Sequence, residues 1–200
     1  MTMMAASARQ ALFGERKMTD APEPLRLDFG CGKNKRPGFQ GCDRIAFDSV
    51  DHVFDIGKER WPFADGSVTE AHASHFIEHL TASERIHFVN ELYRVLIPGG
   101  ACQLIAPHWA SNRAYGDPTH QWPPLAEMWF YYLDKAWRAA NAPHTDAEHF
   151  PNNGFACDFT ATWGYSMHNA LLTRNTEYQQ HALGFWKEAA QDIIATLTKK

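Results

Sequence analysis

The chain has 200 residues, of which 44% are hydrophobic, and this is the size of one ordinary globular domain with its own core. Its 19 basic and 23 acidic residues give a net charge of -4, so no overall positive field would gather nucleic-acid backbones or anionic lipids. No apolar run reaches the roughly 20 residues that a membrane-spanning helix needs. The four cysteines are well separated and form no C-x-x-C pair. We therefore expect a cytoplasmic protein that binds neither a membrane nor bulk nucleic acid.

The first segment, residues 1–24, shows no sustained hydrophobic period and ends in the sequence A-P-E-P. Proline favours extended or turn backbone in the residue before it, which argues against a helix at that point. We expect a mobile leader over 1–24, followed by a single domain over 25–200.

Short apolar runs broken by turn residues follow the leader. Residues 25–29 end at Gly30 and Gly32, as expected for a buried strand that meets a tight turn. Segments 39–45 and 50–56 predict two more short strands, and the alternation over 68–74 predicts a fourth.

A helix is predicted next, because Thr81 and Glu84 have the spacing of a capping box and apolar residues recur behind them at helical intervals. The sequence P-G-G at 98–100 should end this helix, and 101–106 predicts another strand. Strands that alternate with helices indicate an α/β fold with a parallel sheet.

Residues 108–155 are rich in tryptophan, histidine, proline and asparagine, and they predict a cap inserted after the fifth strand. One helix is expected in the cap, over 125–141. We expect its residues Met128, Trp129 and Tyr132 to pack into the core. Strands over 155–167 and 192–198, joined by a helix over 177–190, are expected to close the fold.

The glycine turn after the first strand suits a nucleoside cofactor, because glycine lets backbone come close to a ligand. A G-x-G turn alone is equally often structural. Several further segments stand in a fixed order behind it: Asp43 at the end of the next strand, W-P-F-A-D-G-S at 61–67, S-H-F-I-E-H-L at 74–80, E-L-Y-R-V-L-I-P-G-G at 91–100 and D-P-T-H at 117–120.

In this order the segments over 25–107 resemble the class I S-adenosylmethionine-dependent methyltransferases, specifically the small type-11-like group. The resemblance implies a doubly wound, mostly parallel, seven-stranded Rossmann-like sheet with strand order 3-2-1-4-5-7-6. The strand over 192–198 would be the antiparallel one. The resemblance also implies S-adenosylmethionine as the cofactor, lying over the glycine turn.

Site residues follow from the resemblance by position in this chain. Asp28, Gly30 and Gly32 would surround the amino-acid and ribose parts of the cofactor, and Asp43 would accept the ribose hydroxyls. Asp55 and Ile56 would border the adenine. Ser74, His75 and Phe76 would lie beside the reactive methyl group. The expected cofactor-binding residues are Asp28, Gly30, Cys31, Gly32, Asp43, Asp55, Ile56, Ser74, His75 and Phe76.

The connection between the first two strands is unusually short, because only six residues separate Gly32 from Phe39. Parallel strands normally need a dozen or more residues between them. Either the first helix is reduced to a turn, or the second strand starts later and the ribose carboxylate is Asp48. We favour the reduced helix.

A metal site is the competing interpretation of one motif. His75, Glu78 and His79 satisfy H-x-x-E-H, a zinc-hydrolase pattern that needs all three side chains on one helix face. The pattern is short and the methyltransferase interpretation explains the same residues, so we expect no metal.

His108 follows the fifth strand and His120 lies in D-P-T-H, so both are candidates for a general base at the methyl group. The leading hypothesis is a methyltransferase acting on oxygen or nitrogen of a small-molecule or glycan-like acceptor. A non-catalytic scaffold that binds S-adenosylmethionine and a zinc hydrolase built on His75, Glu78 and His79 are the alternatives.

Overall fold

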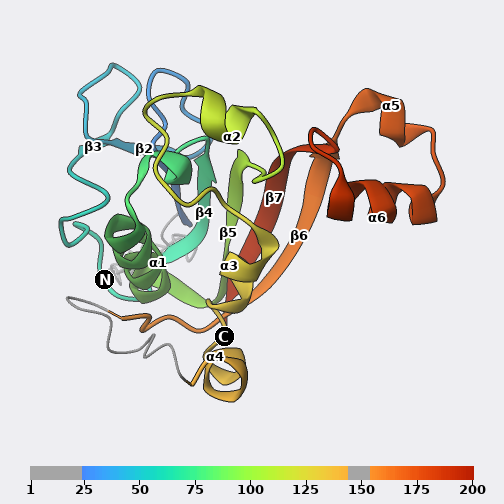
Figure 1. Ribbon diagram of the computed structural model, residues 1–200. Coiled ribbons are helices and arrows are strands. Elements are labelled where there is room, and N and C mark those ends of the chain that lie inside the picture. Colours follow the sequence, from blue (N-terminus) through green and yellow to red (C-terminus); the bar gives the residue numbers. More distant parts are fainter. Residues whose placement is uncertain (1–23, 144–153) are drawn as a thin grey trace, which may run out of the picture.

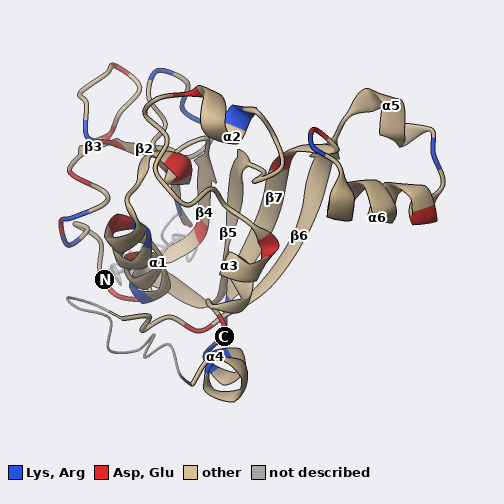
Figure 2. Cartoon of the chain, in the orientation of Figure 1, with Lys and Arg blue, Asp and Glu red and all other residues tan. Residues whose placement is uncertain are grey.

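The computed structural model of the protein describes residues 24–143 and 154–200. The expected leader therefore lies, apart from Pro24, outside the described residues, and so do residues 144–153 of the expected cap. Among the described residues, no helix combines the length and apolar composition needed to cross a membrane. Acidic and basic side chains are interspersed along the chain (Figure 2).

Seven strands form one sheet in the order β3-β2-β1-β4-β5-β7-β6, and β7 runs antiparallel to both of its neighbours (Figure 1). This confirms the predicted topology and strand order. The strands are β1 (Leu25–Phe29), β2 (Gln40–Asp43), β3 (His52–Val53), β4 (Val68–Ser74), β5 (Leu96–Pro107), β6 (Phe159–Met167) and β7 (Ala190–Lys199).

The helices are short apart from α1 and α6. They are α1 (Ala82–Val95), α2 (Arg113–Gly116), α3 (Glu127–Tyr131), α4 (Lys135–Asn141), α5 (Asn169–Leu172) and α6 (Thr176–Phe185), with a single 3-10 turn η1 (Ile77–His79) between β4 and α1. Figure 1 shows α1 and α3 in front of the sheet, while α5 and α6 extend from the end of β6 and β7.

The connection from β1 to β2 contains no helix, yet the two strands pair in parallel. The hypothesis of a reduced first helix is therefore confirmed. Asp43 ends β2, and Asp48 lies in the loop that leads to β3.

The capping box at the start of α1 is present as predicted. The Thr81 hydroxyl accepts a hydrogen bond from the amide of Glu84, and the Glu84 carboxylate accepts one from the amide of Thr81 at 2.8 Å. The helix ends at Val95 and β5 begins at once, so P-G-G at 98–100 does not separate the two. It forms an irregularity in β5, where the pairing with β4 shifts register.

The expected helix over 125–141 is wrong as a single element, because residues 132–134 separate α3 from α4. The Leu133 carbonyl accepts a hydrogen bond from the amide of Phe159 at the start of β6, and the Asp134 side chain caps α4 by accepting from the amide of Trp137. Trp129 packs against the core as expected, whereas Met128 is 56% exposed.

The helix expected over 177–190 ends earlier, at Phe185 in α6. Glu188 has a positive φ of 64° and turns the chain into β7, which starts at Ala190 instead of Asp192. A short turn before β7 therefore replaces the last part of the predicted helix.

The core lies between the sheet and α1. Phe29 of β1 packs against Trp61 with ring centroids 4.2 Å apart, and both rings contact Phe88 of α1. Successive side chains of a strand point to opposite faces of its sheet. Because Leu27 and Phe29 face the core, Asp28 faces the other side of the sheet.

Candidate active site

A cavity of about 640 Å³ lies at the carboxyl ends of β1, β2 and β4, where ligands bind in open α/β sheets. We call it the first cavity. Segments far apart in the sequence meet in it, from the glycine turn to the loop before α3. Its lining residues are Gly30, Asp43, Arg44, Ile45, Phe47, Asp55, Ile56, Gly57, Lys58, His75, Phe76, His79, Leu80, Glu84, Thr119 and Gln121.

The glycine turn forms one wall of the first cavity. Gly30 has a φ of 65°, and its amide donates a hydrogen bond to the Cys42 carbonyl at 2.8 Å. A Cβ atom at Gly30 would lie 2.3 Å from Cδ2 of Phe76, so the Phe76 ring packs directly on the glycine backbone. The turn therefore requires glycine at position 30 both for its backbone conformation and for this contact.

Asp43 places its carboxylate at the end of β2, on the wall of the first cavity. Its Oδ2 accepts from the amide of Gly32 at 3.0 Å, and its Oδ1 accepts from the amide of Ile45 at 3.0 Å. Two backbone bonds fix the carboxylate, and a carboxylate has about four acceptor positions in all. Asp43 can therefore still accept hydrogen bonds from a ligand's paired hydroxyl groups.

Another part of the wall combines charged side chains with an apolar one. Ile56 is buried, and its carbonyl accepts a hydrogen bond from Nε1 of Trp61 at 2.9 Å. Nζ of Lys58 lies 3.4 Å from Oε1 of Glu84 and 3.6 Å from Oδ2 of Asp55. Both carboxylates raise the pKa of Lys58, and Glu84 contributes most. The chain thus offers an apolar surface and polar groups on the same wall.

Six of the ten expected cofactor-binding residues line the first cavity, and the other four do not. Those that line it are Gly30, Asp43, Asp55, Ile56, His75 and Phe76. Gly32 does not line the cavity, but its amide donates the hydrogen bond that fixes the Asp43 carboxylate. Cys31 is buried, and burial raises the pKa of its thiol to about 11. Ser74 ends β4 without lining the cavity.

Asp28 lies on the other face of the sheet, where its Oδ1 is 2.7 Å from Nδ1 of His72 and its Oδ2 accepts from the amide of Arg36 at 2.8 Å. These contacts hold the loop between β1 and β2. The alternation of apolar residues in β1 is the sequence signal that would have placed Asp28 away from the cavity.

His75 follows β4 directly and has a positive φ of 51°. Its amide donates to the Ile105 carbonyl at 2.9 Å, which aligns this turn with the end of β5. Its Nδ1 lies 3.4 Å from Oε1 of Glu78, and this carboxylate raises the pKa of His75 although burial opposes the shift.

A second cavity, of about 720 Å³, adjoins the first, because His75 and His79 line both. Its walls come from the end of β4, from η1, and from the loop around α2. The lining residues are His75, Glu78, His79, Pro107, Arg113, Gly116, Asp117, Pro118 and His120. Several of these were not predicted, and D-P-T-H at 117–120 was the sequence signal that could have found them.

The two histidines expected as general bases differ in their surroundings. His120 lines the second cavity, and its ring centroid lies 4.8 Å from that of His79. His108 is fully buried and lines neither cavity, and its Nε2 lies 3.0 Å from Oε1 of Glu127.

The H-x-x-E-H segment does not lie on an α-helix. His75 precedes η1, η1 is a single turn, and α1 starts only at Ala82. The three side chains therefore do not share the helix face that a zinc hydrolase with this motif requires.

Comparison with known proteins agrees with this arrangement. Residues 45–104 match the family described as a methyltransferase domain. An uncharacterized methyltransferase of Synechocystis sp. is 31% identical over 111 residues, which are 55% of this chain and 49% of the relative. The chain thus spans about half the length of the curated relative that it matches.

The fold is shared with a solved methyltransferase. The crystal structure of an S-adenosylmethionine-dependent methyltransferase from Archaeoglobus fulgidus has a TM-score of 0.58 and 17% identity, over 88% of this chain and 87% of that chain. The strand order and the antiparallel β7 are those of the class I methyltransferase fold. The described residues thus have this fold, and residues 45–104 match the methyltransferase-domain family.

Proposed function

We propose that the protein transfers a methyl group from S-adenosylmethionine to an oxygen or nitrogen atom of a small-molecule or glycan-like acceptor. The observation that carries the proposal is that a glycine turn and a fixed carboxylate, Gly30 and Asp43, line one cavity that adjoins a second, polar cavity. Two adjoining cavities suit a reaction with two substrates.

The first cavity fits the cofactor by its donor and acceptor groups. The positive φ of Gly30 brings backbone without a Cβ atom to the wall, and the free acceptor positions of Asp43 suit ribose hydroxyls. Ile56 supplies an apolar surface of the kind that suits an aromatic base. A volume of about 640 Å³ is within the usual range of ligand sites.

S-adenosylmethionine, when bound, supplies an electrophilic methyl group on a positively charged sulfur. The chain's own task is to orient the acceptor atom where the cavities meet, to exclude water and to take up a proton. Of the two expected bases, only His120 lines a cavity, so we assign contact with the acceptor to His120 and a structural role to His108.

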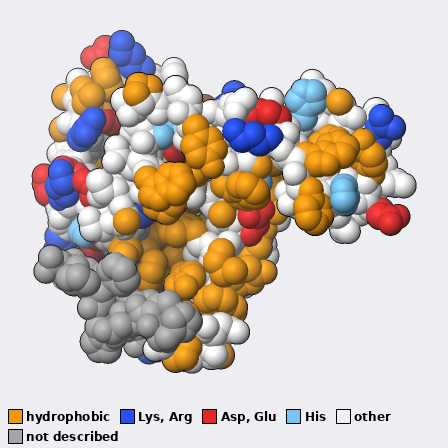
Figure 3. Space-filling model, viewed as in Figure 1, with side chains coloured by type: hydrophobic (Ala, Val, Ile, Leu, Met, Phe, Trp, Pro, Cys, Tyr) orange, Lys and Arg blue, Asp and Glu red, His pale blue; other side chains and the backbone are white. Residues whose placement is uncertain are grey.

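Exposed aromatic side chains support the proposed acceptor class. Figure 3 shows hydrophobic side chains gathered in the middle of this face, over α2 and α3. Tyr115 is 49% and Trp122 is 77% exposed, and α2 also supplies Arg113 to the second cavity. Aromatic rings next to charged groups suit an acceptor with both apolar faces and hydroxyl or amine groups.

The test is methyl transfer from S-adenosylmethionine carrying a labelled methyl group to a panel of small alcohols, amines and sugars. We expect a labelled product and S-adenosylhomocysteine in equal amounts with at least one acceptor class, and no product with Gly30→Val. Cofactor binding with slow hydrolysis but no product across the panel would instead support the binding scaffold. Absence of cofactor binding would overturn the proposal.

A further inference from the structure

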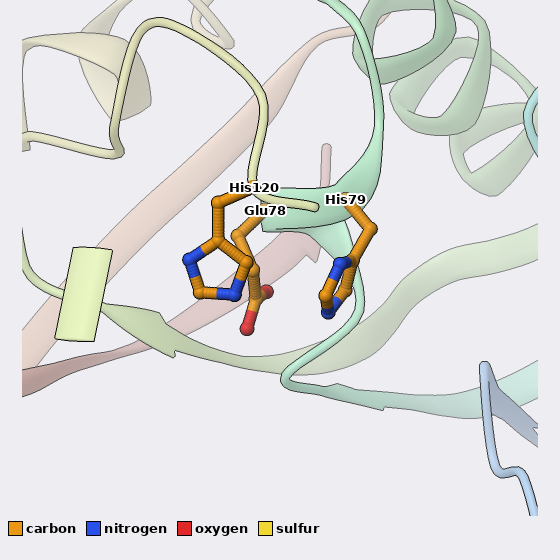
Figure 4. Close-up of side chains that lie close together, drawn as sticks. All are labelled: Glu78, His79 and His120. Atoms are coloured by element: carbon orange, nitrogen blue, oxygen red, sulfur yellow. The ribbon is translucent and has the colours of Figure 1, made fainter. Parts of the chain in front are cut away.

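We propose that Glu78, His79 and His120 bind a divalent transition-metal ion in the second cavity, with Zn²⁺ as the first candidate. One ligand atom from each of these side chains can be chosen so that all lie within 4.8 Å of one another. Figure 4 shows the Glu78 carboxylate between the two imidazole rings. Zn²⁺ bonds to nitrogen and oxygen at about 2.0–2.2 Å, so small side-chain rotations bring these donors onto one ion.

Glu78 carries the strongest indication of a cation site. The residue is only 4% exposed, and both of its carboxylate oxygens are buried without a hydrogen-bond partner. Its charge contact is with Nδ1 of His75, which lies 3.4 Å from Oε1. A buried carboxylate without hydrogen bonds is costly, and coordination of a cation would satisfy it.

His79 is oriented by a chain of hydrogen bonds that leaves one ring nitrogen free. The Thr119 hydroxyl donates to Oδ1 of Asp117 at 2.7 Å, so its oxygen accepts from Nδ1 of His79 at 3.0 Å. Nε2 of His79 then carries the lone pair. Histidines that bind metals typically donate their other ring N–H in this way.

His120 has the same arrangement. Its Nδ1 lies 3.4 Å from the Ala114 carbonyl, which can only accept a hydrogen bond. Nδ1 therefore carries the proton. Nε2 has Oδ2 of Asp117 at 3.8 Å, beyond hydrogen-bond distance, so its lone pair can coordinate an ion. Two imidazole nitrogens and one carboxylate oxygen form a ligand set that suits Zn²⁺ and neighbouring divalent transition metals.

Arg85 holds the two segments that supply the ligands. This guanidinium is 3% exposed and donates hydrogen bonds to four carbonyls, two before α1 and two in the loop after α2. They belong to Ile77, Glu78, Gln121 and Pro123. The amide of Gln121 also donates to the Glu78 carbonyl at 2.8 Å. The ligand positions are therefore fixed before any ion binds.

Charge balance with Arg85 is the alternative explanation for the buried Glu78 carboxylate, since Glu78 raises the pKa of Arg85 against the larger effect of burial. However, Arg85 donates to the backbone carbonyl of Glu78 and not to its carboxylate. The two carboxylate oxygens remain available to a ligand.

Three protein ligands leave coordination positions open, as in catalytic metal sites. His79 lines both cavities, so the ion would lie beside the first cavity. An open position would take the acceptor's oxygen and lower the pKa of its hydroxyl group, so that the proton passes to water and the oxygen takes the methyl group from the sulfonium, which leaves as the neutral thioether; this part rests on the proposed function. His120 then acts as a metal ligand and not as the base.

The test starts from untagged full-length protein freed of metal with a chelator and then dialysed. Zn²⁺ is titrated into it by calorimetry, and Co²⁺ by visible absorption. We expect one ion per chain and Co²⁺ bands that report nitrogen and oxygen ligands. Glu78→Gln and His120→Asn should each weaken binding at least tenfold, whereas His87→Asn, a change outside the cluster, should not.

Circular dichroism and thermal unfolding of the metal-free variants separate loss of the site from loss of the fold. The inference would be overturned if neither ion bound to the wild-type protein. It would also be overturned if both ligand variants bound Zn²⁺ with the affinity of the wild type. S-adenosylhomocysteine binding to the metal-free protein is measured in parallel. Metal binding without cofactor binding leaves this inference standing and refutes only the proposed function, and the reverse result refutes only this inference.

Discussion

The two adjoining cavities are built in different ways. The glycine turn and Asp43, which form one side of the first cavity, stand within a short stretch of chain at the ends of adjacent strands. The second cavity joins η1 to a loop more than 30 residues further along, through the buried side chain of Arg85. The glycine-turn side of the first cavity thus depends on local backbone geometry, and the second cavity depends on one tertiary contact, so substitutions at Gly30 and at Arg85 should affect the two cavities differently.

Gly30→Val should have the largest effect. The added Cβ atom would lie 2.3 Å from the Phe76 ring and would force a branched residue into a positive φ of 65°. We expect a loss of about 3 kcal/mol in the free energy of unfolding and no measurable cofactor binding. Chemical denaturation and calorimetry check both.

Gly66→Ala is the matched control, because Gly66 also has a positive φ, of 61°, but its added Cβ atom would have no neighbour within 4 Å. It should cost about 1 kcal/mol and leave cofactor affinity unchanged. Equal stability losses in the two variants would show that the contact with Phe76 is unimportant.

Arg85→Met should have the next largest effect. It should disturb the structure of the second cavity more than that of the first. It removes the guanidinium donor from four backbone carbonyls, of which those of Ile77 and Glu78 keep a backbone donor, and it removes the hydrogen bonds that hold the loop carrying His120. We expect a loss of about 2–3 kcal/mol in stability and weaker Zn²⁺ binding. Hydrogen exchange should report faster exchange of the Gln121 amide.

Arg60→Met is the control for removing a guanidinium, since the Arg60 side chain is 72% exposed and pairs with the exposed Asp65. Its effect on unfolding should be below about 1 kcal/mol. If Arg60→Met and Arg85→Met destabilised the protein equally, Arg85 would not have the linking role assigned to it.

The smallest predicted effect on stability concerns His108, the buried one of the two histidines expected as general bases. The hydrogen bond from His108 lowers the pKa of Glu127 from 4.5 to about 2, although partial burial opposes the shift. Because the folded pKa is below the unfolded one, the stabilisation is present above about pH 4.5 and is lost as pH falls towards 2. Glu127 is partly exposed, so we expect about 1 kcal/mol.

Urea unfolding at pH 3 and pH 6 measures this difference, and Glu127→Gln should reduce it. An unchanged pH dependence in Glu127→Gln would mean that other carboxylates cause the acid sensitivity. Methyl transfer by a His108→Gln variant should change only as far as its stability does.

Features that depend on local sequence were predictable. The capping box of Thr81 and Glu84 is a contact between near neighbours, the glycine turn shows in the residue type at Gly30 and Gly32, and short apolar runs mark the strands, while the family resemblance supplied the strand order. The short connection after β1 was also interpreted correctly, because G-F-Q-G-C-D at 38–43 resembles the second strand of the family.

Features set by tertiary contacts were not predictable. The break between α3 and α4 depends on a hydrogen bond from Phe159 in β6 to Leu133. His108 and His120 have similar sequence settings, and only the packing of Glu127 against one and Glu78 near the other separates them. Glu78 and His120 are 42 residues apart in the sequence, and no periodic pattern indicates that their side chains lie close together.

The most direct test of the account is calorimetric titration of the wild-type protein and Asp43→Ala with S-adenosylhomocysteine. Asp43 lies on the wall of the first cavity, and its replacement should remove the carboxylate that we propose to accept the ribose hydroxyls. The account predicts one molecule bound per wild-type chain and at least tenfold weaker binding by Asp43→Ala. Absence of binding to the wild-type protein, or equal affinity in a folded Asp43→Ala variant, would contradict it.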